Sequence, residues 1–66
     1  MMILKGVQMP SGTVGQDIRA LRKARGLTLA DLAERVGRSV GWMRQVERDL
    51  SRPSIDELRQ LAGVLE

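Results

Sequence analysis

The chain has 66 residues and lacks both Cys and His, which bounds it to one small domain and excludes disulfides and ordinary zinc sites. The commonest general base and the best side-chain nucleophile are therefore absent, and we expect no enzyme activity, no metal and no cofactor. The net charge is +3, and without a long apolar run or a signal peptide we expect a cytoplasmic protein with no membrane contact.

Residues 1–13 are expected to form an N-terminal arm ahead of the domain. Gly6, Pro10 and Gly12 interrupt the apolar residues of this segment, so no helix is predicted there. A short strand and a disordered chain end both remain open for the arm.

Residues 14–66 carry the signals of an all-α domain with short helices. The N-cap residues Thr13, Thr28, Ser39 and Ser54 precede helices predicted over 14–25, 29–36, 40–48 and 55–65. Apolar residues recur at helical spacing in these segments, as Val14, Ile18 and Leu21, then Leu29, Leu32, Ala33 and Val36, then Met43, Val46 and Leu50, and last Ile55, Leu58, Leu61, Ala62 and Leu65.

Residues 28–47 have the length of a helix, a short turn and a second helix, which is the helix-turn-helix unit that places its second helix in the DNA major groove. At about 100° per residue, the second helix turns Met43, Val46, Glu47 and Leu50 inward and Gly41, Arg44, Gln45 and Arg48 outward. The positive charge also gathers in residues 14–26 and 38–53, which favours an anionic partner.

The order of several short motifs is more specific than any one of them. Arg25-Gly26-Leu27-Thr28 leads into Leu32 to Gly37, followed by Gln45-Val46-Glu47-Arg48 and Pro53-Ser54. In this order the stretch from Val14 to Leu65 resembles the phage-repressor (Cro/C1-type) helix-turn-helix family of transcriptional regulators, also called the xenobiotic response element family. The resemblance implies a compact lambda-repressor-like domain with four of the usual five helices. It also implies a homodimer on a double-stranded DNA operator, more often a repressor than an activator.

The resemblance also implies roles for individual residues. Base reading would fall on Val40, Gly41, Arg44 and Gln45. Phosphate contacts would fall on Thr28, Leu29 (through its main chain), Arg38, Ser39, Trp42, Arg48 and Arg52. An ion pair that supports the fold would join Arg22 to Glu47. Asp49 departs from the family, where Gly is usual, and is expected to place an acid near the DNA backbone.

Two partners other than DNA enter the expectations. We expect a homodimer through the arm, where Ile3, Leu4 and Val7 lie, through the end of the helix over 55–65, or through both. Family members with a similar Thr28-Leu29 start and an aromatic residue like Trp42 often carry a C-terminal sensor domain, which is missing here. An alternative function is a protein-interaction or antitoxin-type module with the same fold, favoured by the acidic segment over 54–66.

Overall fold

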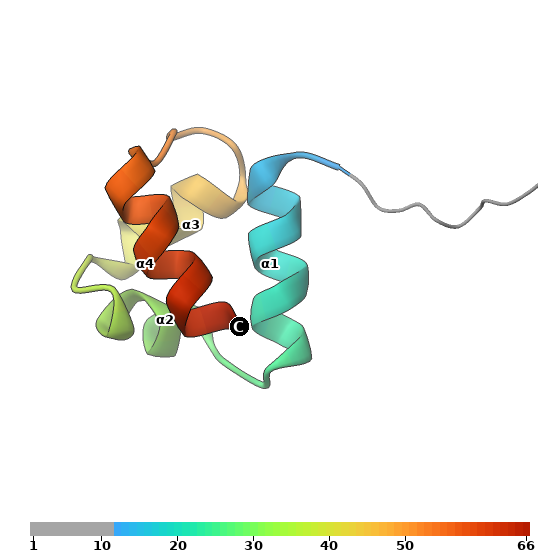
Figure 1. Ribbon diagram of the computed structural model, residues 1–66. Helices are drawn as coiled ribbons and strands as arrows, with labels where there is room; N and C mark the ends of the chain where they lie inside the picture. Colours follow the sequence, from blue (N-terminus) through green and yellow to red (C-terminus); the bar gives the residue numbers. More distant parts are fainter. Residues whose placement is uncertain (1–11) are drawn as a thin grey trace, which may run out of the picture.

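The computed structural model describes residues 12–66, so the prediction of an arm with a short strand or disorder lies outside the described residues except at its last two positions. The described chain forms four helices, α1 (Val14–Ala24), α2 (Leu29–Arg35), α3 (Val40–Glu47) and α4 (Ile55–Leu65) (Figure 1). The four predicted helices are confirmed. Three of them end one residue earlier than predicted, because Arg25, Val36 and Arg48 are C-caps with non-helical backbone.

Local signals start and stop each helix as the sequence predicts. Complete capping boxes form at Thr13, Thr28 and Ser54, while the Ser39 hydroxyl accepts a hydrogen bond from the Trp42 N–H at 3.0 Å. After α1 and α2 the chain turns through Gly26 and Gly37, whose φ angles of 71° and 68° favour glycine. The helix boundaries are therefore set by residues that are neighbours in sequence.

The capping box of α2 also changes the pKa of Asp31. The main-chain N–H of Thr28 donates to the Asp31 carboxylate at 2.9 Å. This hydrogen bond, with a further one to the Thr28 side chain, lowers the pKa of Asp31 below its ordinary value. The stabilisation that it brings is thus present above the unfolded pKa of about 4 and is lost as the pH falls through the lowered pKa.

The core lies where α1 and α2 pack on α3 and where α4 packs on α1, with α4 crossing the front of the molecule in Figure 1. Its buried apolar side chains are Ile18, Leu32, Ala33, Met43, Val46, Leu61 and Leu65. Half-buried Leu27, Leu29, Val36, Trp42, Leu58 and Val64 surround them. Burial of each large apolar side chain contributes about 1.5–3 kcal/mol, so these few residues supply most of the stability of so short a chain.

Five residues assigned to the apolar faces are exposed instead, the small Ala62 of α4 and four larger ones. Val14 (53%) and Ile55 (70%) are the first residues of α1 and α4 and lie at the edge of the core. Leu50 (66%), predicted on the inner face of the third helix, lies beyond the end of α3 at Glu47. It is exposed because the chain turns at Asp49, which has a φ of 61°. Leu21 (44%) lies in a groove between α1 and α4.

Gly15 allows α1 to approach the end of α3 closely. A Cβ atom at this buried position would lie 2.4 Å from the Val46 carbonyl oxygen and 2.7 Å from that of Glu47. Real Cβ atoms do not approach main-chain oxygens so closely, and neither oxygen can move without displacing α3. Glycine at position 15 therefore fixes the distance between α1 and α3.

Gly15→Ala is expected to destabilise the domain by about 1–3 kcal/mol, because the added methyl overlaps main-chain atoms of α3. The control is Gly63→Ala in α4, where a Cβ would meet nothing within 4 Å. This control is expected to stabilise by up to about 1 kcal/mol through helix propensity. Urea unfolding followed by circular dichroism measures both, and equal stability of Gly15→Ala and the wild type would contradict the close approach.

Candidate nucleic-acid interface

The outer face of α3 gathers the predicted base-reading residues on one surface. Gly41, Arg44 and Gln45 are exposed, as is Val40 at the start of the helix. Met43, Val46 and Glu47 are buried on the opposite face. The helical periodicity therefore predicted the two faces of α3 correctly, with Leu50 beyond its end as the exception.

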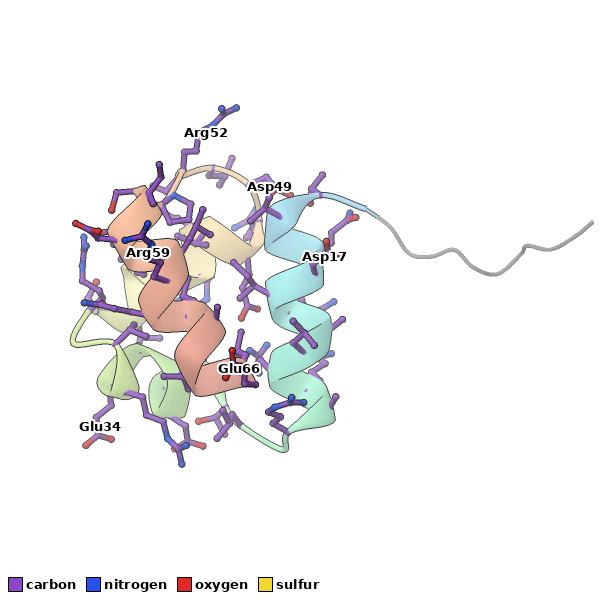
Figure 2. The ribbon with its side chains drawn as sticks, viewed as in Figure 1. Asp17, Glu34, Asp49, Arg52, Arg59 and Glu66 are labelled. Carbon is purple, nitrogen blue, oxygen red and sulfur yellow. The ribbon has the colours of Figure 1, made fainter. Side chains whose placement is uncertain are left out.

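Residues predicted to contact phosphate lie around this face, at the ends of neighbouring elements. Ser39 and Thr28 cap α3 and α2 and are exposed, and Leu29 is half-buried at the start of α2. Arg48 is the exposed C-cap of α3, and Arg52 in the following loop points away from the body of the molecule (Figure 2). The structure thus brings these residues to the rim of α3 without showing what they bind.

Arg38 and Trp42 lie in a cluster with Glu57 that sequence reasoning missed. The Arg38 guanidinium lies over the Trp42 ring, 4.2 Å from its centroid, which is a cation–π distance. Arg38 also forms an ion pair with Glu57, through its Nη1 atom. No local pattern in the sequence indicates that Glu57, in the first turn of α4, lies beside the turn before α3.

Arg22 and Glu47 form the most buried ion pair among the described residues. Arg22 donates from Nε to Glu47 Oε2 at 2.7 Å and from Nη2 to Oε1 at 3.0 Å, and the side chains are 10% and 4% exposed. A third donor, Nη1, reaches the carbonyl of Leu27 at 2.9 Å. The hydrogen bond to Glu47 raises the pKa of Arg22, against the lowering effect of burial. One side chain of α1 thus holds both the last turn of α3 and the chain entering α2.

Asp49 binds the start of α1 through its carboxylate. Its carboxylate accepts hydrogen bonds from the Gly15 main-chain N–H, at 3.0 Å, and from the Thr13 hydroxyl. Figure 2 shows Asp49 beside the start of α1. A negative charge is stabilised there by the N-terminal end of the helix, and Asp tolerates the left-handed backbone better than most residues. The Asp49 carboxylate thus has hydrogen-bond partners inside the chain, and its expected place near a DNA backbone stays a prediction.

The two acids of residues 38–53 are thus turned away from the outer face of α3. Glu47 is buried against Arg22, and Asp49 caps α1. Three arginines of the same segment remain exposed without a protein partner in the described structure, Arg44, Arg48 and Arg52. The surface around α3 therefore carries three arginines that are free to meet an anion.

Gln45 is held by the loop that follows α3. Its side-chain oxygen accepts a hydrogen bond from the Ser51 hydroxyl at 3.3 Å. Its main-chain carbonyl accepts one from the Leu50 N–H at 2.8 Å. This contact was not visible in the sequence, because it depends on the turn at Asp49.

Within residues 12–66, no cluster of three or more potential metal ligands occurs, and none of the helices has the length and hydropathy to cross a membrane.

Comparison with known proteins relates this arrangement to DNA-binding proteins. Residues 13–66 match the family described as helix-turn-helix domain. The chain is 45% identical over 53 residues to the immunity repressor protein of Bacillus phage phi105, covering 80% of this chain and 37% of the repressor. It is 37% identical over 54 residues to the transcriptional regulator SinR of Bacillus subtilis, covering 80% of this chain and 49% of SinR. The chain therefore spans less than half the length of these two relatives.

Solved structures show the same fold. The structure of SinR, the master regulator for biofilm formation, in complex with DNA matches with a TM-score of 0.75 at 37% identity, covering 80% of this chain and 86% of that chain. SinR in its complex with SinI matches with a TM-score of 0.74, covering 80% of this chain and 52% of that chain. The lambda-repressor-like fold expected from the sequence is confirmed.

Glu47→Ala is expected to destabilise the domain by about 3–5 kcal/mol, because it leaves the Arg22 guanidinium buried and unpaired. The double variant Arg22→Met/Glu47→Leu removes both charges and is expected to lose at least 2 kcal/mol less. Chemical unfolding compares the two variants. A double variant as unstable as the single one would show that the unpaired charge is not the cause.

Proposed function

The chain belongs to the helix-turn-helix domain family, and we propose that it is the DNA-binding domain of a transcriptional regulator, a repressor of the phage type. It recognises a specific double-stranded operator through the outer face of α3. The observation that carries the proposal is that face itself, where Arg44 and Gln45 are exposed. Of the neighbouring acids, Glu47 is buried against Arg22 and Asp49 is bound to the start of α1. Similarity to a phage repressor and to a regulator solved in complex with DNA supports it.

In this proposal α3 enters the major groove and reads base edges. Arg44 is suited to pair with guanine and Gln45 with adenine, and Val40 offers methyl groups to thymine. Gly41 has no internal reason to be glycine, since a Cβ there would meet nothing within 4 Å. We infer that the absence of a side chain at Gly41 lets α3 approach the DNA bases closely.

Phosphate contacts hold α3 in the groove. At the C-terminal end of α3, Arg48 and Arg52 would contact phosphate through their unpaired guanidinium groups. At the N-terminal end, Ser39 and the first main-chain N–H groups of α3 would do so. Thr28 and the Leu29 main chain would contact the DNA backbone from the start of α2. Arg38 would contact it from the turn before α3 and Trp42 from the first turn of α3. These contacts position the domain, whereas sequence is read by the residues on α3.

We also propose that the domain acts as a homodimer through the apolar groove between α1 and α4. Its floor and walls are Ile18, Leu21, Leu58, Leu61, Ala62 and Leu65, with Arg25 and Glu66 at the rim. In a two-fold dimer each contact occurs twice, so Arg25 of each copy can meet Glu66 of the other. A dimer of this kind reads two half-sites, about 34–36 Å apart, in a palindromic operator. The part played by the arm lies outside the described residues.

Because the two relatives are more than twice as long as the matched region, we propose that a C-terminal sensor domain controls DNA binding. The compartment is that of the operator, the cytoplasm of a bacterial cell.

The protein-interaction alternative is favoured by the same apolar groove, which would then take another protein. It differs from the main proposal in its use of Arg44 and Arg48. Reversal of both charges abolishes a DNA-dependent function and leaves a function based on the groove intact.

Gln45→Ala is expected to relax the preference for one base pair by about 1–3 kcal/mol, because Gln45 reads that pair directly. Arg52→Ala is expected to weaken all sequences similarly and to make the slope of log K against log salt shallower by about 0.9, because one phosphate contact is lost. Fluorescence anisotropy with duplexes selected from a random pool measures both effects.

Arg59→Ala is the matched control for these variants, because Arg59 is exposed on α4 (Figure 2) and lies outside the proposed interface. It is expected to change the salt slope much less than Arg52→Ala does. Absence of binding by the wild type even at low salt contradicts the proposed function.

Leu21→Glu is expected to convert the dimer to a monomer of 7.3 kDa, because Leu21 is the exposed apolar wall of the groove. Ile55→Glu is the control, since Ile55 is even more exposed but does not line the groove. Analytical ultracentrifugation across a range of concentrations measures the mass. A wild type that stays monomeric at high micromolar concentration contradicts the dimer.

A further inference from the structure

Arg38 differs from the other arginines around α3 because its charge is already neutralised. Its guanidinium carbon lies over the Trp42 ring, 4.2 Å from the centroid, and the group pairs with the Glu57 carboxylate. Arg44, Arg48 and Arg52 have no such acid among residues 12–66. Of the arginines assigned to DNA contact, Arg38 is therefore the one whose use requires a protein contact to be shared or broken.

Glu57 is itself held in place. Its Oε1 atom accepts a hydrogen bond from the Ser54 main-chain N–H at 2.7 Å, while its own N–H donates to the Ser54 hydroxyl at 3.1 Å. This capping box fixes the carboxylate at the start of α4, with Oε2 directed to Arg38. The pair thus joins two residues whose positions are set independently, one by α4 and one by the Trp42 ring.

We propose that Glu57 is an internal competitor of DNA phosphate for Arg38 and thereby limits the part of DNA binding that is independent of sequence. The proposal rests on the proposed function, since it needs α3 to lie in the groove with Arg38 near the DNA backbone. Glu57 then acts on specificity without contact with a base.

The competition follows from the charges. A phosphate that approaches Arg38 meets a guanidinium already paired with one carboxylate, and it is repelled by that carboxylate at short range. The Glu57 side chain is 23% exposed and that of Arg38 is 39% exposed, so the pair is accessible and only partly screened by solvent. Phosphate attraction is the same on every sequence. Neutralisation of Arg38 therefore weakens binding to all DNA sequences. The base contacts of Arg44 and Gln45 then contribute a larger share of the binding free energy.

Glu57→Gln tests the proposal, because glutamine keeps an acceptor for the Ser54 N–H and removes only the charge. Asp56→Asn is the matched control, since it removes the same charge from the adjacent exposed residue in the first turn of α4, without a pair to Arg38. Binding to a selected duplex and to a scrambled duplex is measured by anisotropy at several salt concentrations. Thermal unfolding verifies that each variant is folded.

We expect Glu57→Gln to bind both duplexes roughly threefold to eightfold more tightly at about 0.1 M salt, with a salt slope steeper by about 0.9, as for one added phosphate contact. Asp56→Asn is expected to change both quantities much less. In an Arg38→Gln background, the excess effect of Glu57→Gln over Asp56→Asn is expected to vanish.

Weaker binding by Glu57→Gln overturns the proposal, because Glu57 would then hold Arg38 for the phosphate rather than compete with it. An effect equal to that of Asp56→Asn, or one that persists without Arg38, also overturns it, since the cause would be net charge alone. If the wild type and all variants fail to bind either duplex at low salt, the proposed function itself fails.

Discussion

Arg22 extends from α1 to the last turn of α3, where its two hydrogen bonds to Glu47 are buried. It also donates a hydrogen bond to the carbonyl of Leu27, just before α2. The position of α3 in the domain depends on this interaction more than on any other single contact. A short helix of eight residues has little stability of its own. It offers the buried Met43 and Val46 and the half-buried Trp42 to the apolar core. The buried ion pair adds direction to this packing, since its hydrogen bonds form in one geometry only. Its value lies in orientation, because buried pairs contribute little net free energy.

The end of α3 is fixed a second time, through α1. Gly15 lets the two helices touch, and Asp49 turns the chain through a left-handed residue and caps the start of α1. Both contacts fix the end of α3 against the start of α1. The two acids at this end, Glu47 and Asp49, are therefore bonded to residues of α1. The positive surface around α3 is thus a consequence of the fold as well as of composition. An interface for an anion is produced by the same contacts that orient the helix.

Features that depend on neighbours in sequence could be predicted from local patterns, whereas features that depend on distant contacts could not. The Arg22–Glu47 pair, 25 residues apart, was expected only from the family resemblance. The N-caps Thr13 and Ser54 mark helix starts because their partners lie three residues away. The two faces of α3 follow from helical periodicity. By contrast, the bond from Gly15 to Asp49 spans 34 residues and the pair of Arg38 with Glu57 spans 19, and no local pattern indicates either one. Gly15 did leave a signal, since a glycine inside a helical pattern often marks close packing. The direction of Asp49 left none.

The central claim is that the outer face of α3 reads DNA, and an NMR titration of the isotope-labelled domain with a duplex selected from a random pool tests it most directly. The account predicts that the largest amide shift changes fall within residues 38–48 and at Arg52, together with the side-chain amide of Gln45. Residues of α4 that line the apolar groove, such as Leu61 and Leu65, should change little. Changes confined to that groove and to the facing side of α1, with α3 unaffected, would contradict the account.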